Sequence, residues 1–371
     1  MCCFFLFYLC IWCLEKRIKI YKESVLVKIL FVRTLAIETS CDDTSLAIVT
    51  LDDGFFTVEK ILAYTQTEEH KKRWGVVPEL AARSHAEKIL VILEELAVDR
   101  TSIDTISVTA YPGLPGALIV GITTAYTLGK LHNKTVVEVN HIMGHVFSVL
   151  VERSLTSVEL PYVCLTVSGG HNDLYLVTHE DVHMHHKNAS EWVNEQSGYT
   201  KHNHLAIGDS LQVWPYVVTK LGQTIDDAAG ECFDKVARML WGPYPGGRRI
   251  DELARQYTET AHNSSEISIL HAARLPDQPY NFSFSGIKGQ LHQHIEQWRL
   301  DIRHDAQKAQ VAYMFQEEVT DVLTEKLAKA VQTFGAKTVG VVWWVSANLK
   351  LREKIQEHYV LSTTHLLLPT Q

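Results

Sequence analysis

The sequence predicts an α/β protein built from two similar halves that face a central cleft. The 371-residue chain is long enough for two domains, each with its own core. Its composition of 46% hydrophobic and 21% charged residues is typical of a globular protein. A pattern of two apolar strands joined by a polar turn starts near Val32 and starts again at Tyr162. This repetition predicts duplicated mixed sheets flanked by helices.

The first half is expected to open with three strands, and Asp52-Asp53-Gly54 is typical of a hairpin turn between the second and third. A helix over 78–96 begins with proline and carries apolar residues at helical spacing. A second helix, ending at Leu131, follows the proline- and glycine-rich turn at 112–116. The expected strands of this half are 34–38, 45–51, 55–64, 105–109 and 136–139.

The second half repeats the opening pattern with strands at 162–167 and 174–177. The segment from about 179 to 214 is polar and rich in histidine without clear periodicity, which favours a long loop or insertion. The remaining expected elements are helices at 226–240, 285–298, 306–333 and 346–358 and a strand at 338–345. The chain thus divides into an extension (1–31), a first half (32–150) and a second half (151–371).

The N-terminal extension begins with fourteen almost wholly apolar residues. A membrane-spanning helix needs about 20 such residues, so we expect no stable membrane association. The run also lacks the leading positive charge of a secretory signal. A short anchor and a non-native upstream segment both fit this pattern.

Charge and cysteine usage restrict the partners and the compartment. A net charge of −8 argues against a protein that grips nucleic acid by its overall charge, so a nucleic-acid partner requires a local patch or other subunits. Cys41, Cys164 and Cys232 lack metal-ligand spacing, which favours reduced thiols and a cytoplasmic location.

Two neighbouring motifs are the strongest functional signal. His141 and His145 are four positions apart, so on a helix both imidazoles can reach one cation. The Ser168-Gly169-Gly170-His171 run follows an apolar strand, where glycines let backbone N–H groups approach an anion. A surface histidine pair and a plain turn are the simpler alternatives. A zincin metalloprotease is a poor match, because Ile142 stands where that motif requires glutamate.

Two acidic segments are candidates for catalysis and substrate binding. The turn that contains Asp42 and Asp43 can supply a base, or it can be a solvated hairpin. Asp226 and Asp227 are expected to begin a helix and cap it, with Asp227, Glu231 and Asp234 on one face. Such carboxylates beside small residues suit ribose hydroxyls.

Taken together, these motifs resemble the TsaD family of tRNA N6-adenosine threonylcarbamoyltransferases, in its bacterial or mitochondrial branch. The resemblance covers nearly everything from Val32 to Pro369. It is carried by the segments 37–44, 75–83, 141–145, 168–171, 226–235 and 346–348.

This resemblance implies a two-domain actin-like ATPase (ASKHA) fold and a metal-assisted acyl transfer. The threonylcarbamoyl group would pass from threonylcarbamoyl-adenylate to N6 of adenosine 37 in tRNAs that read ANN codons. Asp42 and Asp43 would be the catalytic carboxylates, and His141 and His145 would bind one divalent metal, Fe(II) rather than Zn(II). The implied substrate contacts are Thr166, Val167, Ser168, Gly169, Gly170, Asp234, Gly247, Asp251 and Asn348. The implied partners are tRNA, a paralogous dimer partner and a small ATPase.

The chain departs from the family pattern in two ways. The third metal ligand of the family, an aspartate, lies in a motif just beyond the last residues of this chain. Tryptophan stands where the family has glycine at Trp74, Trp241, Trp343 and Trp344, which suggests UGA codons that mean glycine. Two alternatives therefore stay open: a catalytically impaired scaffold of the same complex, and a phosphotransferase of the same fold. The histidine pair speaks against the second, because Mg²⁺ prefers oxygen ligands.

Overall fold

The computed structural model describes residues 31–73, 75–179, 207–213, 216–260, 270–297, 302–342, 348–359 and 364–368. Most of the N-terminal extension and of the histidine-rich segment lies outside these residues, as do Trp74, Trp343 and Trp344. The division of the chain into 1–31, 32–150 and 151–371 stays a prediction.

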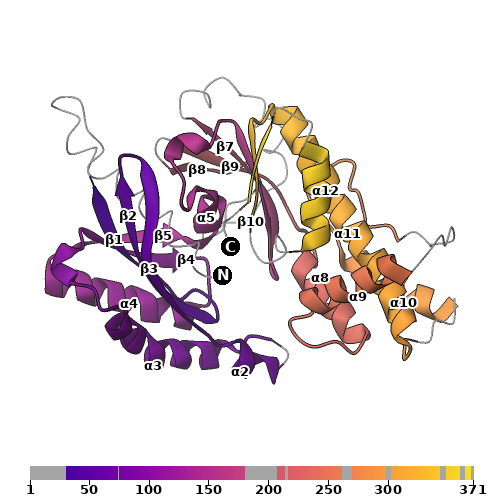
Figure 1. Ribbon diagram of the computed structural model, residues 1–371, viewed down its shortest axis with the longest axis horizontal. Coiled ribbons are helices and arrows are strands. Elements are labelled where there is room, and N and C mark those ends of the chain that lie inside the picture. Colours follow the sequence, from indigo (N-terminus) through magenta and orange to yellow (C-terminus); the bar gives the residue numbers. More distant parts are fainter. Residues whose placement is uncertain are drawn as a thin grey trace.

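Two mixed sheets repeat one strand order (Figure 1). The first has the order β3-β2-β1-β4-β5 and the second β11-β10-β6-β7-β9-β8. In each, a leading strand (β1 or β6) pairs antiparallel with the next strand and parallel with a later one. The strands are β1 (Val32–Glu38), β2 (Asp43–Asp52), β3 (Phe55–Thr65), β4 (Thr105–Tyr111), β5 (Thr135–Asn140), β6 (Tyr162–Val167), β7 (Asn172–His179), β8 (Ser210–Val213), β9 (Tyr216–Gln223), β10 (Thr338–Val342) and β11 (His365–Leu367).

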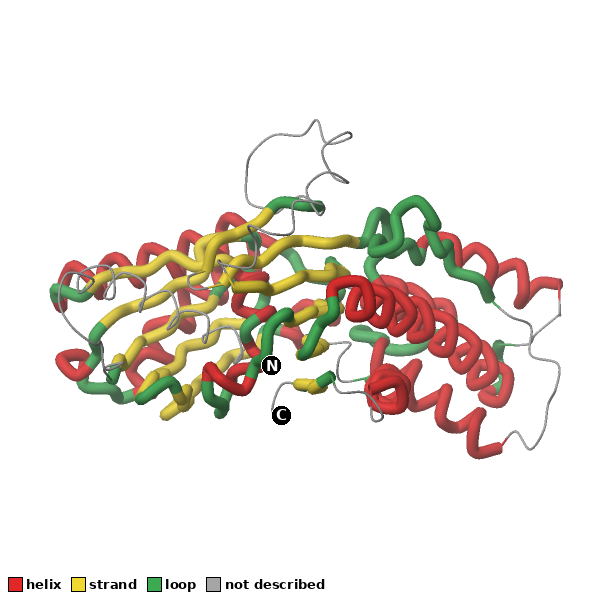
Figure 2. The backbone as a smooth tube through the Cα atoms, turned by 90° about the horizontal axis from the view of Figure 1, so that it is seen from above, coloured by secondary structure: helices red, strands yellow, loops and turns green. Residues whose placement is uncertain are grey.

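Helices cover the outer face of each sheet (Figures 1 and 2). Apolar residues of α3 and α4 pack on the first sheet, and those of α8, α9, α10, α11 and α12 form a larger core with the second. The helices are α2 (Thr67–Lys71), α3 (Pro78–Leu96), α4 (Pro115–His132), α5 (His141–Val146), α8 (Ala229–Met239), α9 (Gly247–Thr260), α10 (Ser285–Gln297), α11 (Asp305–Phe334) and α12 (Leu349–Tyr359). Single 3₁₀ turns lie at η2 (Arg100–Ser102), η3 (Ser148–Leu150) and η4 (Leu155–Ser157).

The two halves share a core. Buried residues of the first sheet, such as Ala36 and Val49, belong to one cluster with Tyr162 and Tyr175 of the second. The short helix α5 lies between the sheets and contributes Met143 to this cluster (Figure 1). The Tyr162 hydroxyl donates to the carbonyl of Val146, at the last residue of α5 (3.0 Å). Burial on both sides therefore fixes α5, which begins with His141.

The expected duplicated α/β fold is confirmed, and the structure adds elements that the sequence did not predict. These are α2, α9, β8, β9 and β11. One expectation was wrong: neither Asp226 nor Asp227 begins or caps the helix that follows them. Helix α8 begins at Ala229, and the Asp226 carboxylate instead accepts hydrogen bonds from the N–H of Phe284 (2.9 Å) and the hydroxyl of Ser285 (2.7 Å). Asp226 thus caps α10 across the fold.

Candidate functional site

Glu38, the last residue of β1, is the buried anchor of the acidic turn. Its carboxylate accepts hydrogen bonds from the Ser40 N–H (2.5 Å) and the Thr109 hydroxyl (2.5 Å). Burial alone would raise the pKa of Glu38, but His141 and these hydrogen bonds hold it below its ordinary value. Glu38 therefore carries negative charge inside the protein and directs it toward His141.

The predicted metal ligands lie together at the start of α5. The rings of His141 and His145 are 5.0 Å apart and nearly perpendicular. The Nδ1 atom of His141 lies 2.9 Å from the Ser40 hydroxyl and 3.4 Å from Glu38 Oε2. A carboxylate on one ring nitrogen orients a histidine so that the other nitrogen can coordinate. Burial holds the pKa of His145 well below its ordinary value, so this ring is neutral, as a metal ligand must be.

The pair fits a divalent cation only in part. Within the described residues, no group of three or more His, Cys, Asp and Glu side chains is arranged to hold a metal. Two histidines leave a tetrahedral or octahedral site open.

The predicted catalytic carboxylates lie on the turn that joins β1 to β2. Burial, with the charge of Asp43, raises the pKa of Asp42. His85 of α3 supports this turn through both nitrogens of its ring and is fully buried. One His85 nitrogen contacts the Thr44 hydroxyl (2.7 Å), and the other lies 3.0 Å from the Cys41 carbonyl. Because a carbonyl only accepts, the nitrogen facing Cys41 carries the proton.

The predicted anion cradle at 168–171 is a tight turn between β6 and β7. The Ser168 hydroxyl oxygen accepts from the N–H groups of Gly170 (3.1 Å) and His171 (2.8 Å), so these two donors already have a partner. A Cβ added at Gly169 or Gly170 would meet nothing within 4 Å, so a ligand can approach both glycines. Gly230 of α8 packs against the other side, and its N–H donates to the Ser168 carbonyl (3.1 Å).

Two other predicted substrate contacts in this segment are buried. Thr166 and Val167 are at most 1% exposed, and the Thr166 hydroxyl donates to the Asp173 carbonyl. Any contact of these two residues with a substrate would therefore use the main chain.

Asp234 and Gly247 meet where α8 faces the start of α9. The Asp234 carboxylate accepts from the N–H of Gly246 (2.6 Å), and burial raises the pKa of Asp234. A Cβ on Gly246 would collide with Ala237, whereas one on Gly247 would meet nothing within 4 Å. Gly246 is therefore needed for packing, and Gly247 lies beside open space.

Asp251 and Asn348 are joined by a residue that the sequence did not single out. Gln316 of α11 donates to Asp251 Oδ1 (3.3 Å) and accepts from Asn348 Nδ2 (3.2 Å). Asn348 also caps α12, since its Oδ1 accepts from the Leu351 N–H (2.9 Å). The same side chain therefore caps a helix and belongs to the predicted substrate contacts. Gln316 interrupts an apolar helical stripe, which is the only signal that the sequence offers.

Tyr244 connects the two halves of the site. Burial raises its pKa, and the charges of Asp234 and Asp42 raise it further. Asp234 belongs to the second half and Asp42 to the first, so the two sets of predicted residues face a common region. Asp227 and Glu231 both form ion pairs with Lys235 (2.7 and 2.9 Å), and the charge of Glu231 adds to burial in raising the pKa of Asp234.

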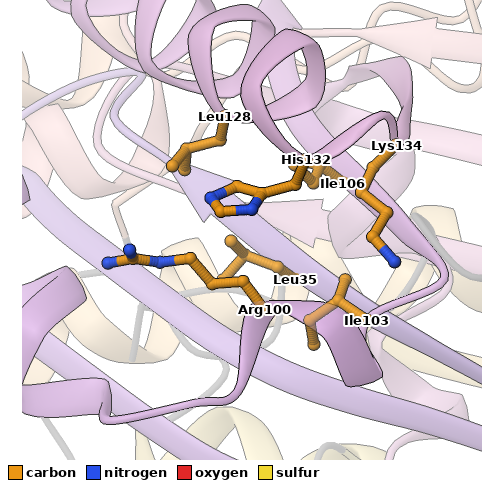
Figure 3. A pocket seen from close by; sticks show the side chains of 7 residues that line it. All are labelled: Leu35, Arg100, Ile103, Ile106, Leu128, His132 and Lys134. Atoms are coloured by element: carbon orange, nitrogen blue, oxygen red, sulfur yellow. The ribbon is translucent and has the colours of Figure 1, made fainter.

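A small hollow elsewhere in the first half contains none of the predicted site residues (Figure 3). It lies near the start of β4 and the end of α4, at the opposite end of the strands from the acidic turn. Leu35, Ile103, Ile106 and Leu128 form its apolar wall, and Arg100, His132 and Lys134 line the rest. In the described part of the chain, no helix has the length and apolarity to cross a bilayer.

The duplicated sheets and the shared core define a two-domain α/β protein of the actin-like class. HypF of T. kodakarensis agrees with this fold, with a TM-score of 0.52 at 12% identity over 93% of this chain and 46% of that one. The family model "TsaD: tRNA N6-adenosine threonylcarbamoyltransferase" matches residues 57–198 and 208–371.

Two relatives carry the same enzyme name. That of Geotalea uraniireducens is 37% identical over 340 residues, which cover 91% of this chain and 85% of the relative. That of Thermosipho africanus is 36% identical over 343 residues, which cover 90% and 88%. The chain belongs to the TsaD family, and the resemblance stated from the motifs is confirmed.

Proposed function

We propose that this chain transfers the threonylcarbamoyl group from threonylcarbamoyl-adenylate to N6 of adenosine 37 in tRNAs that read ANN codons. Family membership supports the reaction class. The observation that carries the proposal is the place of α5, whose His141 contacts Ser40 and Glu38 at the acidic turn while the helix packs in the core that joins the two sheets.

The residues of the second half would bind the adenylate. The open face of Gly169 and Gly170 would receive its phosphate and acyl portion. Asp234 and Asp251, whose pKa values burial raises, would accept hydrogen bonds from ribose hydroxyls. The complete proposed contact set is Thr166, Val167, Ser168, Gly169, Gly170, Asp234, Gly247, Asp251 and Asn348.

In the transfer step, the exocyclic amine of the adenosine would attack the carbamoyl carbon. The bond from that carbon to the adenylate oxygen then breaks, and AMP leaves. The amine must lose a proton, and Asp42 or Asp43 would accept it. Burial and a neighbouring carboxylate raise the pKa of Asp42, which makes this carboxylate a stronger base.

His141 and His145 would hold one divalent metal, with Fe(II) preferred to Zn(II). Their adjacent rings and the neutral state of His145 support this proposal. When bound, such a metal polarises an acyl oxygen and neutralises developing charge. Glu38 and Ser40 would hold the His141 ring in the required orientation.

A paralogous dimer partner and a small ATPase complete the proposed system, which would act on tRNA in the cytoplasm. Helices α3 and α4 pack against each other and expose five large apolar side chains. These are Leu90, Val91, Ile119, Tyr126 and Leu131, which are 49–72% exposed. Apolar faces of this kind are typical of interfaces. A partner subunit here would also help an acidic chain to engage tRNA.

Complementation tests the proposal. The full chain is expressed in a strain that lacks its own enzyme, and threonylcarbamoyl-adenosine in the tRNA is measured by mass spectrometry. We expect the wild type to restore the nucleoside and His141→Ala to abolish it. Failure of the wild type with intact partner binding would support a scaffold instead, and full activity of His141→Ala would refute the metal role.

A further inference from the structure

Gln316 stands between two proposed substrate contacts that come from different elements. It lies in the middle of α11 and is 3% exposed. Its Nε2 lies 3.3 Å from Asp251 Oδ1 on α9, and its Oε1 lies 3.2 Å from Asn348 Nδ2 at the start of α12. One buried carboxamide thus joins three helices at the proposed adenylate site.

The chemistry of the neighbours fixes the direction of both hydrogen bonds. An ionised Asp251 can only accept, so the NH₂ group of Gln316 must face it. Asn348 uses its oxygen to cap α12 at Leu351, so its NH₂ group faces Gln316. The arrangement therefore has one consistent orientation, in which Asn348 donates to Gln316 and Gln316 donates to Asp251.

We propose that Gln316 is a positioning residue of the adenylate site, whose carboxamide holds the Asp251 carboxylate and the Asn348 amide in the orientation that binds the substrate. This inference rests on the proposed function. An amide NH₂ carries two donors and a carboxylate about four acceptor positions, so Asn348 and Asp251 each retain capacity for a ligand. Functional groups bind best when neighbouring hydrogen bonds hold them in place beforehand.

The surroundings of Gln316 make it a firm support. Phe315 is fully buried beside it, and Thr320, one turn further along α11, is also fully buried. The other carboxylate oxygen of Asp251, Oδ2, lies 3.6 Å from Nε of Arg255, whose side chain is 55% exposed. An exposed cation gives weak directional control, because water and salt screen it. Gln316 is therefore the better-ordered partner of Asp251.

Two variants of Gln316 separate positioning from packing. Gln316→Met keeps the volume but removes both hydrogen bonds. Gln316→Glu keeps the volume and an acceptor for Asn348 but places a second carboxylate against Asp251. The matched control is Thr320→Val, because the Thr320 hydroxyl donates only to carbonyls of its own helix, those of Gln316 (2.7 Å) and Glu317 (3.0 Å).

The measurements are the Kd of AMP by calorimetry on the full chain and the KM and kcat of threonylcarbamoyl-adenosine formation with its partners. Loss of one hydrogen bond to a charged group corresponds to roughly a 10-fold change in affinity. We expect Gln316→Met and Gln316→Glu to raise the Kd of AMP and the KM for the adenylate by about 10-fold, with a smaller change in kcat. We expect Thr320→Val to leave both constants at the wild-type values.

Unchanged AMP binding in the folded Gln316 variants would overturn the inference while leaving the proposed function intact. An equal loss in Thr320→Val would overturn it too, since packing alone would then explain the effect. If Gln316→Met does not fold, the Kd of AMP and the KM for the adenylate measured with Gln316→Glu provide the test. A wild type that binds AMP but forms no threonylcarbamoyl-adenosine would refute the proposed function alone, and one that binds no AMP would refute both.

Discussion

Gly230 gives the sharpest link between packing and function, because it supports the turn at 168–171. A Cβ at this position would lie 2.5 Å from the Ser168 carbonyl oxygen and 2.8 Å from the Gly169 Cα. Both atoms belong to backbone, so no flexible side chain can move aside. Gly230→Ala must therefore displace either the turn or the first turn of α8.

The size of the effect follows from two opposing contributions. Alanine favours a helix over glycine by about 0.5–1 kcal/mol. Overpacking a tight contact costs about 1–3 kcal/mol, so the difference spans about 0–2.5 kcal/mol and we expect a net loss of stability of about 1 kcal/mol. Ordinary contacts begin near 3.4 Å, so the turn must shift by several tenths of an ångström. A misplacement of about 1 Å can lower the rate of an enzyme about 100-fold.

The assay combines urea unfolding with the kinetics of threonylcarbamoyl-adenosine formation. Gly289→Ala is the matched control, because it lies inside α10 and its Cβ would meet nothing within 4 Å. We expect Gly289→Ala to be slightly more stable than the wild type. We expect Gly230→Ala to be less stable and to lose about 10- to 100-fold in kcat/KM, because a misplacement of about 1 Å costs about 100-fold. The reasoning fails if Gly230→Ala matches the control in both measurements.

Two further predictions concern His85 and Trp241. Burial lowers the pKa of His85, so below a pH of about 6.5 the unfolded chain binds a proton that native His85 does not. The free energy of unfolding should therefore decrease as the pH is lowered below about 6.5, and it should decrease less steeply in His85→Gln. An identical pH dependence of the two proteins in urea unfolding would contradict this. Trp241 has a φ of 56° at the end of α8 and is 65% exposed. Trp241→Gly should relieve about 1–2 kcal/mol of backbone strain in the folded state. Two losses oppose this gain: glycine adds about 0.5–1 kcal/mol of chain entropy to the unfolded state, and the contact of the Trp241 ring with Lys308 disappears. We therefore expect Trp241→Gly alone to change the free energy of unfolding little, and to raise it by about 0.5–1 kcal/mol in a Lys308→Gln background. A lower free energy of unfolding in that background would rule out the strain.

The geometry of Trp241 bears on the suggestion that its codon means glycine. The N–H of Gly242 donates to the Ala237 carbonyl (2.7 Å), and that of Trp241 donates to the Arg238 carbonyl (3.1 Å). These two bonds form a Schellman motif, in which the residue with positive φ is usually glycine. A tryptophan with its side chain largely in water gains little there. A UGA codon at position 241 would therefore support the suggestion that it means glycine, and a UGG codon would refute it.

Periodicity predicted most of the fold because burial is regular in it. Strands β1 to β7, strand β10 and the helices over 78–96 and 306–333 are recognisable from apolar spacing, whereas β8, β9 and β11 are not. Helix α9 was not predicted, because its many charged residues obscure the stripe that buries Ile250, Leu253 and Ala254. The cap of α10 could not be predicted either, since Asp226 lies 59 positions before Ser285.

The predicted site residues lie in motifs that gather polar groups in short runs of sequence. The residues that support them by hydrogen bonds lie outside such runs. Glu38, His85 and Gln316 are each buried within an apolar pattern, where sequence alone favours a structural reading. Their roles depend on pairings such as His85 with Cys41, 44 positions apart, and Gln316 with Asp251, 65 positions apart. Local spacing contains no information about such contacts.

The duplicated topology explains why the two sets of residues face each other. The acidic turn follows β1, the leading strand of the first sheet, and the turn at 168–171 follows β6, the leading strand of the second. Asn348 follows β10, which occupies in the second sheet the place that β4 holds in the first. Parallel neighbours in a sheet end at the same edge, so β6 and β10 both end at the edge that carries the turn at 168–171. The shared core around α5 then brings this edge towards His141 and Asp42, which is how two halves with different motifs can form one site.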